Sequence, residues 1–211
     1  MMAFTLPRIY PITDRPISGS DHLTQIRSMA AGGATLIQLR EKFLPSDEFF
    51  SEAQEAAEFA RAEGLTLIIN DRVDIALASG ASGVHLGQED LNAAAARRLM
   101  GDDAVIGIST HNLAQAAEAA RLPVDYIAIG PVFQTATKTD PDPVVGLEGV
   151  SAAKEAVGDI PLVAIGGISL ANFRDVLAAG ADSVAVIGAV LEHPEGISRA
   201  VSEFLSQIGD E

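Results

Sequence analysis

Short hydrophobic runs recur at fairly even intervals along the whole chain. Each run is continuously apolar rather than alternating, which is typical of parallel strands that are covered on both faces. We predict eight strands, at residues 8–13 (RIYPIT), 34–39 (ATLIQL), 65–69 (LTLII), 82–86 (SGVHL), 104–108 (AVIGI), 124–129 (VDYIAI), 160–165 (IPLVAI) and 182–187 (DSVAVI).

The segments between these strands are rich in alanine and have a helical period. Clear examples are residues 46–64, 92–101 and 113–122. Several segments end in a glycine that is typical of a helix C-terminus, at Gly64, Gly101, Gly158 and Gly180. Eight alternating strand and helix units in 211 residues predict a compact (β/α)8 TIM barrel that forms a single domain over residues 1–211.

A doubly wound open sheet is the structural alternative. That fold usually has fewer strands and a glycine-rich first turn, which the segment YPITDRPISG does not supply. The pattern therefore favours the barrel.

Composition limits the chemistry and the partners of the chain. Hydrophobic residues make up 48% of it and aromatic residues only 5%, so the core must be built mainly from aliphatic side chains. The absence of cysteine excludes disulfides, thiolate metal sites and cysteine nucleophiles. The net charge of −15 argues against nucleic acid or an anionic membrane as a partner, because both require a basic surface.

The lengths of the hydrophobic runs also indicate where in the cell the protein is expected. All are strand-sized, which is too short to cross a bilayer, and the N-terminal stretch MMAFTLPRIYPITDR has too short an apolar run for a signal peptide. We therefore expect a cytoplasmic protein with no membrane partner. The sequence leaves open whether it forms a homo-oligomer.

In a TIM barrel the reacting groups lie at the carboxyl ends of the strands. Most of the polar residues suited to chemistry in this chain follow predicted strands. They are Gln38, Arg40, Lys42, Asn70, Asp71, Gln88, Asp90, Ser109, His111, Thr135, Thr137 and Lys138. We expect them to meet at one rim of the barrel.

The segment QLREK, residues 38–42, places an amide and two cations directly after the second predicted strand. If the strand continues, Gln38, Arg40 and Lys42 point to the same side, because side chains alternate along a strand. Arginine and lysine are the usual ligands of phosphate, so the segment can act as an anion clamp. The alternative is an ordinary solvated loop in which Glu41 is the salt-bridge partner.

The segments NDR (70–72) and GQED (87–90) follow neighbouring predicted strands, so Asp71 and Asp90 can face each other. Two carboxylates suit Mg²⁺, which commonly takes one or two carboxylates together with water and phosphate oxygens. General acid–base chemistry by the aspartate pair is a second interpretation. In a third, Asp90 caps a helix that begins near Leu91, and Asp71 or Asp74 caps the preceding helix.

Three further features lie after later strands. The segment GPVFQTATKTDPDPVVGL, residues 130–147, is too long for a minimal turn and predicts a lid or binding loop that carries Thr135, Thr137 and Lys138. The alternative is a flexible surface loop without a role in binding. The segments AIGGIS and AVIGAV end the last two predicted strands, where many TIM barrels hold a phosphate with backbone N–H groups.

The sequence predicts different roles for two of the histidines. His85 lies within a predicted strand, so we interpret it as a core residue or as support for the site. His111 stands just beyond the fifth strand and is the better candidate for acid–base chemistry, although it can also cap or line a loop.

Taken together and in order, the segments QLREK, NDR, GVHLGQED, GIST, GPVFQTATK, AIGGI and GADSVAVIGA resemble the thiamine phosphate synthase family. The resemblance runs from about Tyr10 to Ala189. It implies a TIM barrel that couples hydroxymethylpyrimidine pyrophosphate to hydroxyethylthiazole phosphate and releases pyrophosphate. The family mechanism is dissociative: the C–O bond breaks first, and the thiazole nitrogen then attacks a pyrimidine-stabilised cation.

The resemblance also implies a role for individual residues. Mg²⁺ would be bound by Asp71 and Asp90, and the residues acting on the reacting groups would be Arg40, Lys42, Ser109 and Lys138. Gln38 and Asn70 would help to hold the pyrimidine pyrophosphate, with Ser109 near the pyrimidine or the leaving group. The thiazole phosphate would be held by Thr135, Thr137, Gly167, Ile187 and Gly188.

One position departs from the family pattern, and two rival functions remain. Many members carry serine where this chain has Gly188, so a hydroxyl contact to the thiazole phosphate is missing. Thiazole tautomerases share the barrel and use a histidine after the fifth strand, which His111 could supply. A sensor that binds pathway phosphates without catalysis is the second rival.

Overall fold

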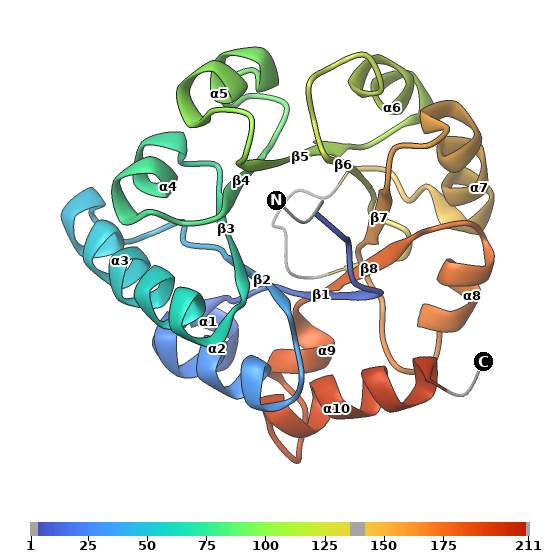
Figure 1. The fold of residues 1–211 in the computed structure, drawn as a ribbon. Coiled ribbons are helices and arrows are strands. Elements are labelled where there is room, and N and C mark those ends of the chain that lie inside the picture. The colour runs from blue at the N-terminus through green and yellow to red at the C-terminus, as the bar shows by residue number, and fades with distance from the viewer. Residues whose placement is uncertain (1–3, 136–141, 210–211) are drawn as a thin grey trace.

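Eight parallel strands form the centre of the computed structural model, which describes residues 4–135 and 142–209. They are β1 (Ile9–Pro11), β2 (Leu36–Leu39), β3 (Thr66–Asn70), β4 (Gly83–Leu86), β5 (Val105–Thr110), β6 (Tyr126–Ile129), β7 (Leu162–Ile165) and β8 (Ser183–Val186). The strand order is β1-β8-β7-β6-β5-β4-β3-β2, and a bridge between Ile12 and Gln38 brings β1 beside β2. The sheet therefore closes on itself as a barrel (Figure 1).

Helices surround the barrel on the outside (Figure 1). They are α1 (Arg15–Ser18), α2 (His22–Ala31), α3 (Ser46–Glu63), α4 (Val73–Ser79), α5 (Ala93–Met100), α6 (Leu113–Ala119), α7 (Gly146–Val157), α8 (Phe173–Ala178), α9 (Gly188–Leu191) and α10 (Ile197–Ile208). Each predicted strand overlaps an observed one, although β3 and β5 extend one and two residues beyond their predicted ends, and the open-sheet alternative is wrong. Continuous apolar runs identified the strands because both faces of each strand are covered.

The predicted helix ends are largely confirmed. Gly64, Gly101 and Gly158 are the C-caps of α3, α5 and α7, and all three have positive φ. Gly180 lies one residue beyond Ala179, the C-cap of α8. No helix in the described part of the chain is long and apolar enough to cross a membrane.

The strands separate two hydrophobic clusters. The larger lies between the barrel and the helices, and the smaller fills the barrel itself. The interior cluster contains Tyr10, Ile12, Leu36, Ile68, Val105, Tyr126, Ala128, Val163 and Ala185. Gly107 is required here, because a β-carbon at this position would lie 2.1 Å from Cζ of Tyr126. The missing side chain on β5 makes room for the Tyr126 ring.

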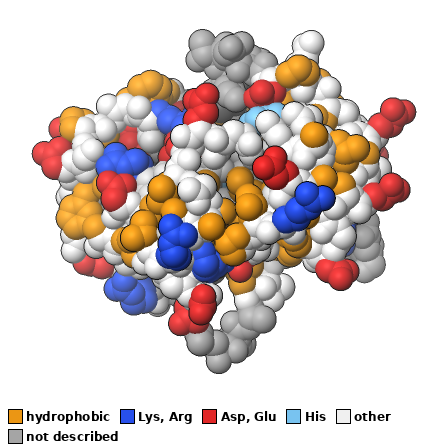
Figure 2. Space-filling view, turned by 90° about the horizontal axis from the view of Figure 1, so that it is seen from above, with side chains coloured by type: hydrophobic (Ala, Val, Ile, Leu, Met, Phe, Trp, Pro, Cys, Tyr) orange, Lys and Arg blue, Asp and Glu red, His pale blue; other side chains and the backbone are white. Residues whose placement is uncertain are grey.

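The outer surface is mixed in character on the side shown in Figure 2. Acidic, basic and hydrophobic side chains are interspersed over the helices there, and the basic ones do not form a continuous basic face.

Candidate active site

The parallel strands bring their carboxyl ends to one rim, and several of the predicted site residues lie at or near those ends. Gln38 is on β2, Asn70 is the last residue of β3, and Ser109 is on β5. Gln38 and Asn70 are 3% and 7% exposed, whereas Ser109 is half-buried. The sequence correctly placed these three residues at the mouth of the barrel.

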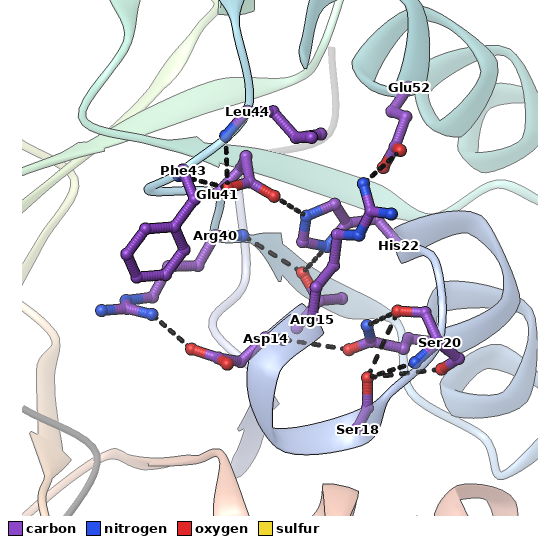
Figure 3. A network of polar contacts seen from close by, with 12 residues as sticks. Asp14, Arg15, Ser18, Ser20, His22, Arg40, Glu41, Phe43, Leu44 and Glu52 are labelled. Atoms are coloured by element: carbon purple, nitrogen blue, oxygen red, sulfur yellow. Dashed lines mark hydrogen bonds and ion pairs between the residues drawn. The ribbon is translucent and has the colours of Figure 1, made fainter. Parts of the chain in front are cut away.

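Arg40 is held by residues that follow β1. Its guanidinium forms an ion pair with Asp14, and its backbone N–H donates to Thr13 Oγ1 at 3.1 Å (Figure 3). Asp14 is itself fixed, because its other carboxylate oxygen accepts the Ile17 N–H at 3.1 Å and caps α1. Asp14 was not among the predicted site residues, although an acid directly after the first strand is a signal of the same kind as Asp71.

Glu41 has a structural role that the sequence did not reveal. Its carboxylate bonds to Nε2 of His22 at 3.0 Å and accepts the N–H groups of Phe43 and Leu44 at 2.5 and 3.0 Å (Figure 3). Glu41 is only 8% exposed, so the interpretation of a solvated loop with Glu41 as partner of the cations is wrong. Instead Glu41 fixes the turn that carries Arg40 and Lys42.

The His22–Glu41 pair also connects to Arg40. Nδ1 of His22 bonds to Thr13 Oγ1 at 2.8 Å, and Thr13 accepts the Arg40 N–H. Burial lowers the pKa of His22 despite the carboxylate beside it. Burial would raise the pKa of Glu41, but the bonds from Phe43 and His22 outweigh it and the pKa lies below its ordinary value. The pair therefore anchors the turn that carries Arg40 and Lys42 to α2.

Lys42 reaches across to the end of β3. Its ammonium group donates to Asp71. Asp71 has a φ of 64°, and its backbone N–H donates to His85 O at 2.7 Å. A left-handed conformation is uncommon outside glycine and often marks a functional position. The strained turn directs the Asp71 carboxylate toward the rim.

Asp90 lies close to Asp71, as the spacing predicted. Burial raises the pKa of Asp90, the Gly87 N–H that donates to it at 2.7 Å lowers it, and the Asp71 carboxylate raises it again. The net effect is a pKa above the ordinary value. Two carboxylates this close together are suited to share a cation.

The helix-capping interpretation of these acids is wrong. Helix α5 is capped by Asn92, whose side chain accepts the Ala95 N–H, and the N-cap of α4 is Arg72. Asp74 pairs with Arg72 instead. Asp71 and Asp90 are thus available for another role.

The donor set can be compared with the needs of a divalent cation. The described residues contain no group of three or more histidine and acidic side chains that could hold a metal ion. Mg²⁺ often takes only one or two carboxylates and completes its shell with water and phosphate oxygens. The Asp71–Asp90 pair fits that smaller donor set.

Ser109 is bound to a buried histidine. His85 Nε2 lies 2.8 Å from Ser109 Oγ, and Nδ1 lies 2.9 Å from the hydroxyl of Tyr126. Burial lowers the pKa of His85 to about 4, and it raises the pKa of Tyr126. The histidine is therefore neutral and the tyrosine protonated at pH 7. The expectation that His85 supports the site agrees with this placement.

His85 should make the protein sensitive to acid. Below pH 6.5 the unfolded chain protonates His85, whereas the folded protein does not do so until the pH approaches about 4. We expect the free energy of unfolding to fall by about 3 kcal/mol across this window because of His85 alone. Denaturant unfolding at pH 7 and pH 4.5 measures the loss. His85→Gln, which cannot titrate, should show a smaller decrease, and equal decreases in both proteins would contradict the prediction.

The loop after β6 is described only in part. Thr135 is half-buried, whereas Thr137 and Lys138 lie outside the described residues. His111 contacts this loop through Nδ1, which lies 2.9 Å from Gly130 O and 3.4 Å from an Asp142 oxygen. In the described residues His111 therefore connects β5 to the loop after β6.

The end of β7 lies next to that loop. Gly167 has a φ of 65°, and a β-carbon there would lie 2.5 Å from Gln134 O and 2.7 Å from Phe133 Cβ. Glycine is therefore needed for this packing. Ile187 is the N-cap of α9 and Gly188 its first residue. Both lie where backbone N–H groups are available to a ligand.

A model of the thiamine monophosphate synthase family matches residues 9–190 of this chain. The chain belongs to this family. A thiamine-phosphate synthase of Chloroflexus aurantiacus is 46% identical over 185 residues, which cover 87% of this chain and 85% of that protein. A thiamine-phosphate synthase of Clostridium novyi is 44% identical over 200 residues and covers 93% and 98% of the two chains.

Solved structures agree with this family membership. The thiamine phosphate pyrophosphorylase from Pyrococcus furiosus superimposes with a TM-score of 0.86 at 36% identity, over 96% of each chain. A 3-hexulose-6-phosphate synthase, with a TM-score of 0.69 at 17% identity, shares the fold alone. The resemblance predicted from the sequence segments is confirmed at the level of the family and the barrel.

Proposed function

We propose that this chain is a thiamine phosphate synthase that works as a single TIM-barrel domain. It would couple hydroxymethylpyrimidine pyrophosphate to hydroxyethylthiazole phosphate and release pyrophosphate. The observation that carries the proposal is the meeting of a two-cation clamp, Arg40 and Lys42, with the opposed acids Asp71 and Asp90 at one rim. A pyrophosphate with a bound divalent cation requires this combination of charges.

Each substrate would use one part of the rim. The pyrimidine pyrophosphate would be held by Gln38, Arg40, Lys42, Asn70, Ser109 and Lys138, with Mg²⁺ on Asp71 and Asp90. The thiazole phosphate would be held by Thr135, Thr137, Gly167, Ile187 and Gly188. These substrates are small charged molecules, so we also propose a cytoplasmic enzyme without nucleic-acid or membrane partners.

The residues of this chain would promote a dissociative reaction by position and charge. When held by Asp71 and Asp90, Mg²⁺ would supply positive charge that stabilises the leaving pyrophosphate. The Arg40 guanidinium can form two parallel hydrogen bonds to one phosphate, and Asp14 fixes its direction. The apolar barrel interior beneath Gln38 and Ser109 would limit the access of water to the pyrimidine cation that forms in the reaction. This chemistry needs no covalent nucleophile.

A direct assay tests the proposal. The purified protein is incubated with both substrates and Mg²⁺, and thiamine phosphate and pyrophosphate are measured. We expect both products in equal amounts. A thiazole isomerised without coupling would indicate a tautomerase, and binding without any product would indicate a sensor. Either result would overturn the proposal.

Gly188→Ser tests the one departure from the family pattern. A β-carbon at this position would meet only a carboxylate oxygen of Glu192, at 3.0 Å, which is the movable end of a long side chain. We therefore expect the serine to fit and to leave the Michaelis constant for the thiazole phosphate unchanged or lower, with similar turnover. Steady-state kinetics with varied thiazole phosphate measures this. A large loss of turnover would show that the site depends on glycine here.

A further inference from the structure

Five side chains form a line of hydrogen bonds through the barrel interior. Gln38 Nε2 donates to the Tyr10 hydroxyl at 3.0 Å, and the two tyrosine hydroxyls lie 3.0 Å apart. Tyr126 then contacts His85, and His85 contacts Ser109, at 2.9 and 2.8 Å. The line joins β2 to β5 through β1, β6 and β4. Both of its ends, Gln38 and Ser109, are residues of the proposed pyrimidine site.

The donors in this line can be assigned one after another. Because the Tyr10 oxygen accepts from Gln38, its own proton is available for Tyr126. Tyr126 can then donate to Nδ1 of His85, so the neutral ring carries its proton on Nε2 and donates to Ser109 Oγ. The hydroxyl proton of Ser109 is then free to point toward the mouth of the barrel. Among the described residues it has no other acceptor.

The opposite direction of donation would leave the Tyr10 hydroxyl proton without an acceptor. If Tyr126 donated to Tyr10, the Tyr10 oxygen would accept twice and its own proton would have no acceptor in the described part of the chain. Tyr10 is 1% exposed, so water cannot replace the acceptor. A buried donor without a partner is strongly disfavoured. With the Gln38 amide nitrogen facing Tyr10, the contacts therefore select one direction.

We propose that Tyr10, Tyr126 and His85 are positioning residues that fix Ser109 as a hydrogen-bond donor and leave Gln38 Oε1 as an acceptor. This inference rests on the proposed function, which brings the pyrimidine to these residues. An aminopyrimidine carries an amino donor and ring-nitrogen acceptors, and it matches this pair of groups. A ring with an oxo group in place of the amino group does not match Gln38 Oε1.

The tyrosine hydroxyl can be removed without disturbing the packing. The Tyr126 ring fills the space beside Gly107, meets the Tyr10 ring edge-on with centroids 5.8 Å apart, and stacks on His85 at 5.5 Å. Phenylalanine keeps all three contacts. Tyr126→Phe therefore removes the two hydrogen bonds of this hydroxyl while it keeps the ring, and its melting temperature must be measured to check that the fold is kept.

The first test needs no activity. Nitrogen-15 NMR of histidine-labelled protein, with His85→Gln used to assign the signal, locates the ring proton. We expect it on Nε2, with Nδ1 accepting a hydrogen bond that is lost in Tyr126→Phe. A proton on Nδ1 in the wild type, or an Nδ1 signal unaffected by Tyr126→Phe, would overturn the proposal. Neither result depends on whether the protein is a synthase.

The second test is a double-mutant cycle on kcat/KM for the pyrimidine pyrophosphate. We expect Ser109→Ala to cost about tenfold in the wild type and less than about threefold in Tyr126→Phe, because the serine is then no longer held as a donor. The KM for the thiazole phosphate should stay the same in Tyr126→Phe. Ile68→Val, an interior substitution without a polar group, is the control and should combine with Ser109→Ala additively. Additive effects of Tyr126→Phe and Ser109→Ala would overturn the proposal, whereas a wild type without coupling activity would overturn the proposed function.

Discussion

Asp90→Ala is expected to lower the rate of coupling and the affinity for Mg²⁺ together. A pyrophosphate carries about three negative charges, and each charge repels a carboxylate 4 Å away by about 4 kcal/mol at an effective dielectric constant of about 20. Lys42 offsets part of this repulsion through its bond to Asp71. Asp90 forms no ion pair with any described residue, and its carboxylate accepts the Gly87 N–H. The divalent cation would turn this repulsion into ligation.

We expect a loss of about a hundredfold or more in kcat/KM for Asp90→Ala, which corresponds to about 3 kcal/mol. Turnover measured against Mg²⁺ concentration should show a higher half-saturation, and Asp71→Ala should behave similarly. Asp74→Ala is the matched control, because Asp74 is an exposed carboxylate on α4 that pairs only with Arg72 in the described contacts. Full activity in chelator, or variants with unchanged metal dependence, would remove the metal site.

Arg40→Ala should lower kcat/KM for the pyrimidine pyrophosphate by about ten- to a hundredfold, because a charge-assisted hydrogen bond is worth about 1.5–3 kcal/mol. Arg40→Lys keeps the charge but not the planar fork, so it should recover only part of the loss. Steady-state kinetics measures both variants. The kcat/KM for the pyrimidine pyrophosphate should fall more than the kcat/KM for the thiazole phosphate.

Arg72→Ala is the control for Arg40→Ala. Arg72 forms an exposed ion pair with Asp74, and such pairs contribute little to stability. It should leave turnover close to normal. The melting temperature of Arg40→Ala shows whether Asp14, which loses its cation, still caps α1. Near-normal turnover of Arg40→Ala would contradict the proposed clamp.

The barrel and its rim were accessible from the sequence because both depend on local patterns. A continuous apolar run identifies a buried parallel strand, and the residue after it lies at the rim of the barrel. Asp71 and Asp90 were found in this way. Their alternative as helix caps was excluded only when the structure showed Asn92 in that role.

The supporting residues could not be predicted from the sequence. Tyr10 and Tyr126 bond across 116 positions, and Arg40 pairs with Asp14 across 26. No local period specifies such partners, since they depend on the order and tilt of the strands. Glu41 was misinterpreted for a related reason. Its charge suggested a partner for the adjacent cations, whereas the fold buries it against His22.

The Tyr126 ring occupies the space beside Gly107, so the side-chain sizes at positions 107 and 126 depend on each other. Any side chain at position 107 would enter the space of the ring, and a smaller residue at 126 would leave a void in the barrel. A designer who wishes to enlarge the floor of the site must therefore change both positions in the same variant. An alanine at 107 becomes acceptable only when the ring on β6 is removed.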